Sequence, residues 1–97
     1  MRIIWSPLSV ERMTEISDYI AEDNLEASII WVESVFNIID RLKQYPDSGR
    51  IVPEINKPNI REMIHGNYRI IYKIHKDELH IFTIRHFKQI LPSGEVN

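Results

Sequence analysis

The chain contains no cysteine and only three glycines among its 97 residues. The lack of cysteine excludes a disulfide framework and thiolate metal sites, and so few glycines leave no dinucleotide fingerprint. The sequence also lacks a phosphate loop, a G-x-S-x-G motif and an H-E-x-x-H motif. No apolar run approaches the roughly 18 residues of a membrane span, and the first residues do not resemble a signal peptide. We therefore expect a cytoplasmic protein that uses no cofactor and no metal.

The composition is ordinary for a globular protein, with 43% hydrophobic and 27% charged residues. The length fits a single domain over residues 1–97. The net charge of −2 is unevenly distributed, because residues 1–48 carry four Lys/Arg against nine Asp/Glu and residues 49–97 carry eight against five. This basic excess suggests that anionic or polar partners meet the second half. The alternative is that helices in the first half simply carry more glutamate.

The first half of the sequence predicts one strand and two helices. Arg2–Trp5 is β-prone, and Ser6 and Pro7 suit the N-cap and first position of a helix over 7–22. A second helix is predicted over 25–45. Its apolar residues form two stripes, one of Trp31, Val35, Ile38 and Leu42 and the other of Ile29, Val32, Phe36 and Ile39. So wide an apolar surface needs two neighbours. The first helix and a sheet would supply them, and the alternative is that a partner protein covers part of the helix.

The second half predicts a loop and an antiparallel meander. Prolines and Gly49 mark a loop over 46–59. Strands are predicted over 60–65, 68–75 and 79–87, followed by a tail that we expect to be flexible over 90–97. Segregated strands and helices indicate an α+β fold with the order β-α-α-β-β-β. We expect its core, between the helices and the sheet, to contain Trp31, Val35, Ile38, Ile70 and Tyr72.

Tight turns between the strands predict which side chains share a face. A two-residue turn at Gly66 and Asn67 places Arg61 opposite Tyr72, and one at residues 76–77 places Arg69 opposite Ile84. Opposed residues share a face, which predicts Arg69, Lys73, His80 and His86 on one face and Arg61, His65 and Arg85 on the other. A change of one residue in the second turn would reverse the partition for the last strand.

An arginine and a histidine on one sheet face could perform phosphodiester chemistry. Arg69 would neutralise the phosphate, and His86 would act as general acid or base near neutral pH. Glu54 in the preceding loop could supply a second proton-transfer group. The alternative is that these residues are solvated positions on strands.

Several segments resemble the ParE/RelE toxins of type II toxin–antitoxin systems. They are IIWSP at 3–7, ISDYI at 16–20, YPDSGRIVPEI at 45–55, IREMIHGNYRIIYKI at 60–74 and LHIFTIRHFKQ at 79–89. The GNYRIIYKI part is the most specific, and together the segments span most of the chain. The resemblance implies the β-α-α-β-β-β fold read above and a cognate antitoxin that wraps and silences the toxin.

The family resemblance implies one of two activities. RelE-like members cleave mRNA in the ribosomal A site, whereas ParE-like members inhibit DNA gyrase. A long helical hairpin, of about 16 and 21 residues, and the sequence at 60–74 favour the ParE branch. For the nuclease branch, Arg69 falls where RelE-like members carry a catalytic Arg, and Glu54 resembles the loop Glu of one subgroup. Either His86 or Phe87 then takes the terminal position, where the nucleases usually carry a Tyr.

We therefore expect a ParE-like gyrase inhibitor that acts by protein contact, with no catalytic residue. The first alternative is a ribosome-dependent mRNA endonuclease that uses Arg69, His86 and Glu54, with the ribosome and mRNA as partners. The second alternative is an inactive homologue that only binds an antitoxin. The candidate contact surface is basic and consists of Arg61, Arg69, Lys73, Arg85, His86 and Lys88.

Overall fold

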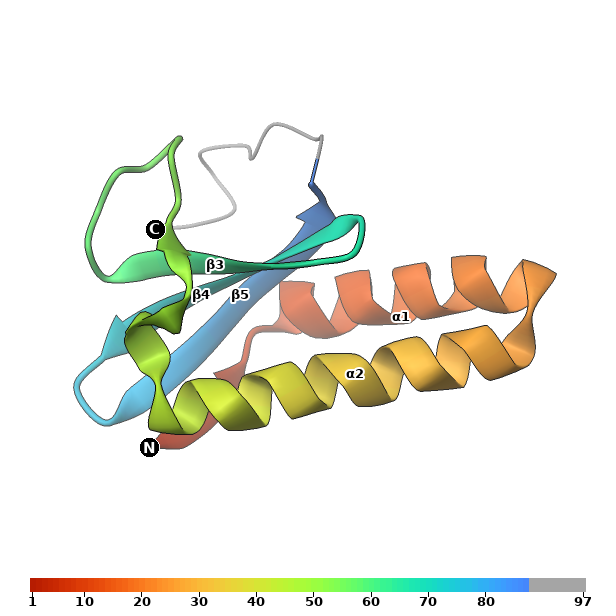
Figure 1. Ribbon diagram of the computed structural model, residues 1–97, viewed down its shortest axis with the longest axis horizontal. Coiled ribbons are helices and arrows are strands. Elements are labelled where there is room, and N and C mark those ends of the chain that lie inside the picture. Colours follow the sequence, from red (N-terminus) through yellow and green to blue (C-terminus); the bar gives the residue numbers. More distant parts are fainter. Residues whose placement is uncertain (88–97) are drawn as a thin grey trace.

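In the computed structural model, which describes residues 1–87, a helical hairpin lies against one face of a five-stranded sheet (Figure 1). The strand order across the sheet is β1-β5-β4-β3-β2. The predicted α+β arrangement is therefore confirmed. The elements are β1 (Arg2–Trp5), α1 (Pro7–Asp23), α2 (Leu25–Gln44), the 3-10 helix η1 (Pro46–Ser48), β2 (Arg50–Ile51), β3 (Ile60–His65), β4 (Tyr68–His75) and β5 (Glu78–His86). The predicted flexible tail lies outside the described residues.

Side-chain caps determine where both helices begin. Ser6 Oγ accepts a hydrogen bond from the Ser9 amide at 3.0 Å, and Asn24 Oδ1 accepts one from the Ala27 amide at 3.0 Å. Each cap satisfies an amide that would otherwise lack a partner in the first helical turn. In the described part of the chain, neither helix is long and apolar enough to cross a membrane.

The first strand lies beside the last strand in the sheet. β1 pairs in parallel with β5, so that Ile3 lies opposite Leu79. The link continues at the start of α1, where Ser6 donates through its amide to the Ile81 carbonyl and through Oγ to the Phe82 carbonyl. α1 is thus anchored beside the second half of β5, where the strand β1 has already ended.

The core between hairpin and sheet contains the residues that the sequence predicts. Val35, Ile38, Ile70 and Tyr72 are buried, and Trp31 is half-buried against the same cluster. The first predicted stripe of α2 therefore faces the sheet.

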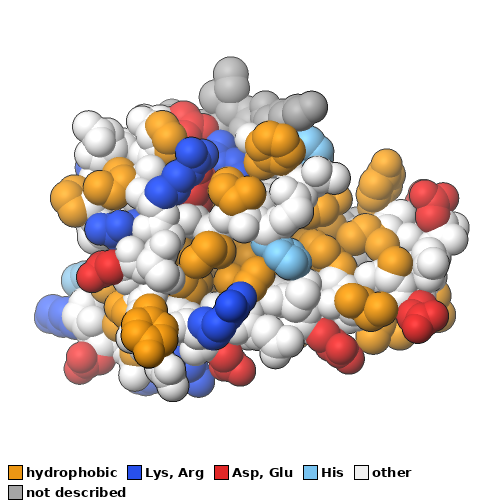
Figure 2. All heavy atoms as spheres, in the orientation of Figure 1, with side chains coloured by type: hydrophobic (Ala, Val, Ile, Leu, Met, Phe, Trp, Pro, Cys, Tyr) orange, Lys and Arg blue, Asp and Glu red, His pale blue; other side chains and the backbone are white. Residues whose placement is uncertain are grey.

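The second predicted stripe of α2 is covered only in part. Ile39 is buried and Val32 packs against the core, but Ile29 and Phe36 are about half exposed. The loop end of the hairpin projects past the sheet (Figure 1), and orange side chains are visible on this projecting end in Figure 2. The expectation that the first helix and a sheet would cover the whole surface is wrong, because Phe36 stays about half exposed even beside β1, where its ring contacts Trp5.

The segment predicted as a loop over 46–59 also contains regular structure. It begins with η1 and continues into β2, whose Arg50 lies opposite Glu62 and whose Ile51 lies opposite Arg61. Two paired residues are too few to produce an alternating sequence pattern, so the sequence analysis does not predict the short strand β2.

A β-bulge changes the register between β4 and β5. Both predicted turns are correct, since His65 lies opposite Tyr68 and His75 opposite Glu78. Tyr72 pairs with Ile81, but Ile71 pairs with Thr83, so one extra residue of β5 is accommodated at this point. The bulge allows both Ile81 and Ile84 to be buried in the core beneath the hairpin. Regular alternation would send Ile84 to the other face, and this explains the irregularity.

Candidate functional site

The bulge redistributes the basic residues of the last strand. Arg69 lies opposite Arg85 rather than Ile84, and Tyr68 lies opposite His86. Because opposed residues share a face, Arg85 joins Arg69, Lys73 and His80, whereas His86 joins Arg61 and His65. The prediction that Arg69 and His86 share a face is therefore wrong, and so is the predicted placement of Arg85.

An arginine–carboxylate cluster occupies the face of the sheet opposite the hairpin. Arg69 Nε donates to Glu62 Oε1 at 2.6 Å, and Arg50 Nε donates to Glu62 Oε2 at 2.6 Å. The Glu62 side chain is fully buried and that of Arg69 is 4% exposed. Both oxygens of the buried carboxylate thus accept a charge-assisted hydrogen bond, which is the condition for keeping such a charge inside a protein.

The outer edge of Arg69 is held by the loop that follows β2. Its two terminal nitrogens donate to the two oxygens of Glu54, at 2.7 and 2.9 Å, in a bidentate pair. The hydrogen bond to Glu54 is the largest cause that raises the pKa of the Arg69 guanidinium, and Glu62 adds to it. Arg69 and Glu54 are therefore together, as the nuclease reading requires, but they neutralise each other.

A small apolar cluster positions this loop. Val52, Ile60 and Ile71 are buried on the same face, with Ile55 and Phe82 packed against them. The loop is thus attached to the sheet by apolar contacts at Val52 and Ile55 and by the ion pair at Glu54. This combination gives Arg69 a structural task, the fastening of a loop to the sheet.

Arg61 also has a structural role. Its Nε donates to the Pro58 carbonyl at 3.0 Å and one terminal nitrogen donates to the Gly49 carbonyl at 2.9 Å. Beside it, the buried Tyr72 hydroxyl donates to the Pro46 carbonyl at 2.6 Å and accepts from the Gly49 amide. Burial raises the pKa of Tyr72. These contacts hold η1 and β2 against the sheet.

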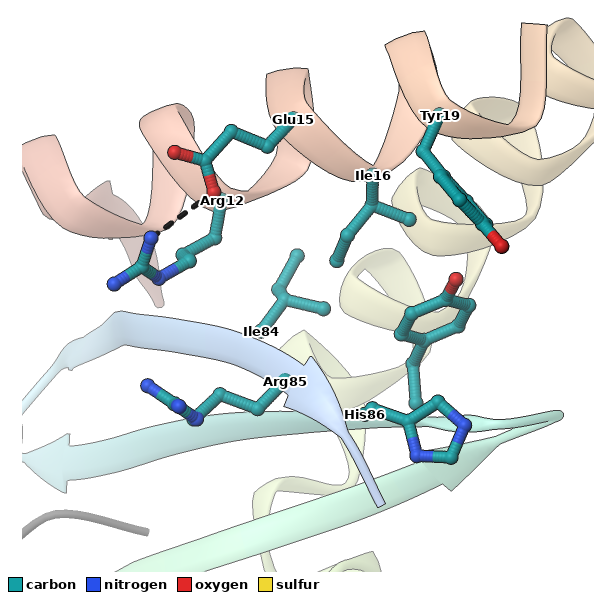
Figure 3. Close-up of a pocket in the computed structure, with 8 residues that line it drawn as sticks. Arg12, Glu15, Ile16, Tyr19, Ile84, Arg85 and His86 are labelled. Atoms are coloured by element: carbon teal, nitrogen blue, oxygen red, sulfur yellow. Dashed lines mark hydrogen bonds and ion pairs between the residues drawn. The ribbon is translucent and has the colours of Figure 1, made fainter. Parts of the chain in front are cut away.

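A groove of about 390 Å³ lies between α1, the start of β4 and the end of β5. Figure 3 shows Ile16 and Tyr19 directed from α1 toward the sheet, with the Arg12 guanidinium bonded to Glu15. Arg85 and His86 both border the groove. The lining residues are Arg12, Glu15, Ile16, Tyr19, Tyr68, Ile84, Arg85 and His86.

Aromatic rings form the floor of this groove at its end nearest the hairpin tip. Tyr68 contacts Trp31 and His86 edge to face, with ring centroids 5.4 and 5.9 Å apart. Burial, and secondarily Tyr19, raise the pKa of Tyr68. The groove therefore combines apolar rings with hydroxyl, imidazole and guanidinium groups, a combination suited to binding polar side chains of another protein.

The other predicted residues are dispersed. Lys73 and His80 oppose each other on the far face, where Lys73, His75, His80 and Phe82 line a hollow of about 140 Å³. Lys88 lies outside the described residues. Among residues 1–87, no three His, Cys, Asp or Glu side chains are grouped so that they could hold a metal ion.

Two residues of these sites, Glu62 and Tyr19, could have been identified from the sequence. Glu62 is a carboxylate within a strand whose neighbours are mainly apolar, which is a signal for a buried partner of opposite charge. Tyr19 falls three residues after Ile16 on the same side of α1. The groove itself depends on the bulge and on the packing of α1, and no local pattern encodes it.

Comparison with known proteins gives a consistent family. Residues 3–91 match the family described as ParE toxin of type II toxin-antitoxin system, parDE. A candidate toxin, Y4kP, of Sinorhizobium fredii (strain NBRC 101917 / NGR234) is 34% identical over 93 residues, which cover 94% of this chain and 93% of that protein. A solved chain of the chromosomal ParDE TA system from P. aeruginosa shares the fold, with a TM-score of 0.72 and 18% identity over 89% of this chain and 95% of the other.

Proposed function

Because the chain belongs to the ParE toxin family of type II toxin–antitoxin systems, we propose that it is a ParE-like toxin that inhibits DNA gyrase. A cognate antitoxin neutralises it by covering its surface. The toxin acts by protein contact and arrests growth because replication requires gyrase. No residue of the chain transfers a proton in this activity.

The burial and the hydrogen bonds of Arg69 are the observation that favours gyrase inhibition over the nuclease alternative. A nuclease needs a guanidinium that faces the phosphate in the transition state. Arg69 is 4% exposed, with Nε donating to Glu62 and both terminal nitrogens donating to Glu54. A phosphate would have to displace a bidentate carboxylate before Arg69 could act on it.

The position of His86 supports the same choice. Arg69 and His86 project from opposite faces of the sheet, because Arg69 pairs with Arg85 and His86 with Tyr68. The ring of His86 instead stacks on Phe87, with centroids 5.4 Å apart. A general acid must reach the same phosphodiester that the arginine binds, and this pair is badly placed for that task.

For the contact surface we propose the groove beside α1, together with the basic residues at its lower edge. Arg85 and His86 border the groove, and Tyr19 is 69% exposed above it. Exposed tyrosine and arginine are the residue types that contribute most binding energy at protein interfaces. Arg61 and Arg69 are excluded from this surface because their side chains fasten the loop between β2 and β3.

The decisive experiment uses purified protein in two reactions, gyrase supercoiling of a relaxed plasmid and cleavage of mRNA on translating ribosomes. We expect supercoiling to be inhibited and the mRNA to stay intact. Addition of the antitoxin encoded beside the toxin should restore supercoiling. A Glu54→Gln variant, verified as folded by circular dichroism, should inhibit gyrase as the unmodified protein does.

Other outcomes have distinct meanings. Cut mRNA that stays intact with Glu54→Gln, beside unaffected gyrase, would establish the ribosome-dependent nuclease. If folded protein affects neither reaction and binds the antitoxin, the chain is an inactive homologue. Either result would overturn the proposal.

A further inference from the structure

The hollow on the far face of the sheet lies at the end of β4 and the start of β5, near the turn that joins these strands (Figure 1). Lys73, His75, His80 and Phe82 line it. Lys73 and His80 lie opposite each other on the two strands, and His75 shares their face because side chains alternate along a strand. One ammonium group and two imidazoles therefore converge on a single small hollow.

Phe82 supplies an apolar wall of this hollow. The β-bulge leaves Phe82 without a partner on β4, and its ring packs against the buried apolar cluster of Val52, Ile60 and Ile71. The ring also contacts that of His80, with centroids 6.4 Å apart. A charge beside an apolar wall acts more strongly on a ligand than it would in open water, because the local dielectric is lower.

Within residues 1–87, the positive charge of Lys73 is paired with no carboxylate. The carboxylate of Glu78, on the neighbouring strand, already has two partners. Its Oε1 accepts a hydrogen bond from His80 Nε2 at 3.0 Å, and its Oε2 pairs with the Arg2 guanidinium at 3.2 Å. The Lys73 ammonium can therefore attract an anion into the hollow.

The two imidazoles can add to this attraction. Because a carboxylate only accepts hydrogen bonds, Nε2 of His80 is the donor to Glu78, and Nδ1 is its second ring nitrogen. The His75 ring contacts the His80 ring, with centroids 6.4 Å apart. A neutral imidazole has one acceptor nitrogen, whereas a protonated imidazole is positive and donates from both nitrogens. Protonation of either ring therefore strengthens the attraction for an anion.

We propose that this hollow binds a phosphate group, which Lys73 and the protonated forms of His75 and His80 hold by charge-assisted hydrogen bonds. Its volume of about 140 Å³ admits a group of this size. A metal cation fits less well, because Lys73 would repel it and no three ligating side chains are grouped in the described part of the chain. The phosphate belongs either to a nucleic acid backbone or to a small phosphorylated molecule.

This phosphate site is separate from the groove beside α1. That groove lies between α1 and the sheet, at the start of β4 and the end of β5, whereas the hollow lies on the far face at the opposite ends of the same strands. The inference therefore does not depend on gyrase being the target. A ligand in the hollow leaves the target groove open.

The test follows the backbone amide signals of isotope-labelled protein by NMR. The probes are thymidylyl-thymidine, which carries one phosphodiester, its uncharged methylphosphonate analogue, and inorganic phosphate. At pH 6 the dinucleotide should shift the signals of Lys73 and His80, and the uncharged analogue should leave them in place. Between pH 8 and pH 6 the affinity for the dinucleotide should rise about fivefold or more, because histidines gain charge in this range and the phosphodiester does not change.

Variants separate the hollow from the general charge of the surface. Lys73→Gln should weaken binding of the dinucleotide about fivefold or more. Lys76→Gln is the matched control, since it removes the same charge from an exposed turn position that does not line the hollow, and it should change binding less than about twofold. The double variant His75→Gln/His80→Gln should abolish the pH dependence. It keeps Arg2, Lys73 and Glu78, the charged groups that face the two rings from β1, β4 and β5. The amide spectrum verifies that each variant is folded.

Inorganic phosphate distinguishes the two sources of the ligand. If it binds as tightly as the dinucleotide, the site serves small phosphorylated molecules, and if it binds about fivefold more weakly or less, the site serves a nucleic acid backbone. Either result supports a phosphate site. The proposal is overturned if the dinucleotide does not shift Lys73 and His80, if the uncharged analogue binds equally well, or if Lys73→Gln and Lys76→Gln have equal effects. Zinc that shifts both histidines when the phosphate probes do not would show a cation site and would also overturn it.

Discussion

Glu62→Ala tests whether the arginine–carboxylate cluster is structural. The substitution removes the only fully buried carboxylate among the described ion pairs and leaves its two arginine partners in different situations. Arg50 is 61% exposed and can be rehydrated, so its loss of a partner costs about 0–1 kcal/mol. Arg69 is 4% exposed and cannot reach water through Nε.

The magnitude follows from that difference. Removing one member of a buried ion pair typically costs about 3–5 kcal/mol, because a charge stays behind without compensation. Arg69 retains Glu54, so we expect the lower half of this range. Glu54→Ala should cost less, about 1–3 kcal/mol, because the Glu54 side chain is 30% exposed and its site can admit water. Arg50→Ala should cost least of the three.

Urea unfolding followed by tryptophan fluorescence measures this order directly. The double variant Glu62→Leu/Arg69→Met, which replaces the pair by apolar side chains, should be more stable than Glu62→Ala alone. A cost below about 1 kcal/mol for Glu62→Ala would refute the reasoning, because Arg69 would then be hydrated or held by other groups. If the folded double variant still arrests growth, Arg69 has no catalytic role.

Two further variants test the core and the buried phenol. Ile38→Ala should lower the free energy of unfolding by about 2–5 kcal/mol in the same urea assay, because Ile38 is buried beneath the sheet, whereas Ile30→Ala should change it by less than about 0.5 kcal/mol. Tyr72→Phe should be less stable at pH 8, since the hydrogen bond to the Pro46 carbonyl is lost. Its stability should fall less steeply than that of the unmodified protein above about pH 10, because the raised pKa of Tyr72 means that the folded state favours the neutral phenol and loses this advantage as the unfolded chain ionises.

The elements of the fold could be predicted because local signals encode them. Ser6 with Pro7, and Asn24, mark the helix starts, and Gly66 with Asn67 marks a hairpin whose register is as predicted. The bulge could not be predicted by counting from the turn at residues 76–77. The bulge forms because Ile81 and Ile84 both pack into the same core. That core exists only once the helices lie on the sheet.

The candidate site was predictable in its residue types and not in its arrangement. Arg69 and Glu54 do lie together, but the partner that makes Arg69 structural is Glu62, seven residues earlier and on the neighbouring strand. Such a pair requires β3 and β4 to be in register. The separation of Arg69 from His86 results from the single extra residue of the bulge, and an error of one residue inverts a whole strand end.

The parallel pairing of β1 with β5 determines when the sheet can be completed during synthesis of the chain. The first strand has no partner until residues 78–81 have been made, and the groove beside α1 needs Arg85 and His86 as well. At a synthesis rate of about 5–20 residues per second, the nascent chain waits roughly 4–15 seconds between these two strands. During that interval the helical hairpin can form, but its sheet-facing stripe has nothing to cover it. The groove that we propose as the contact surface is therefore complete only when the last strand has joined the first.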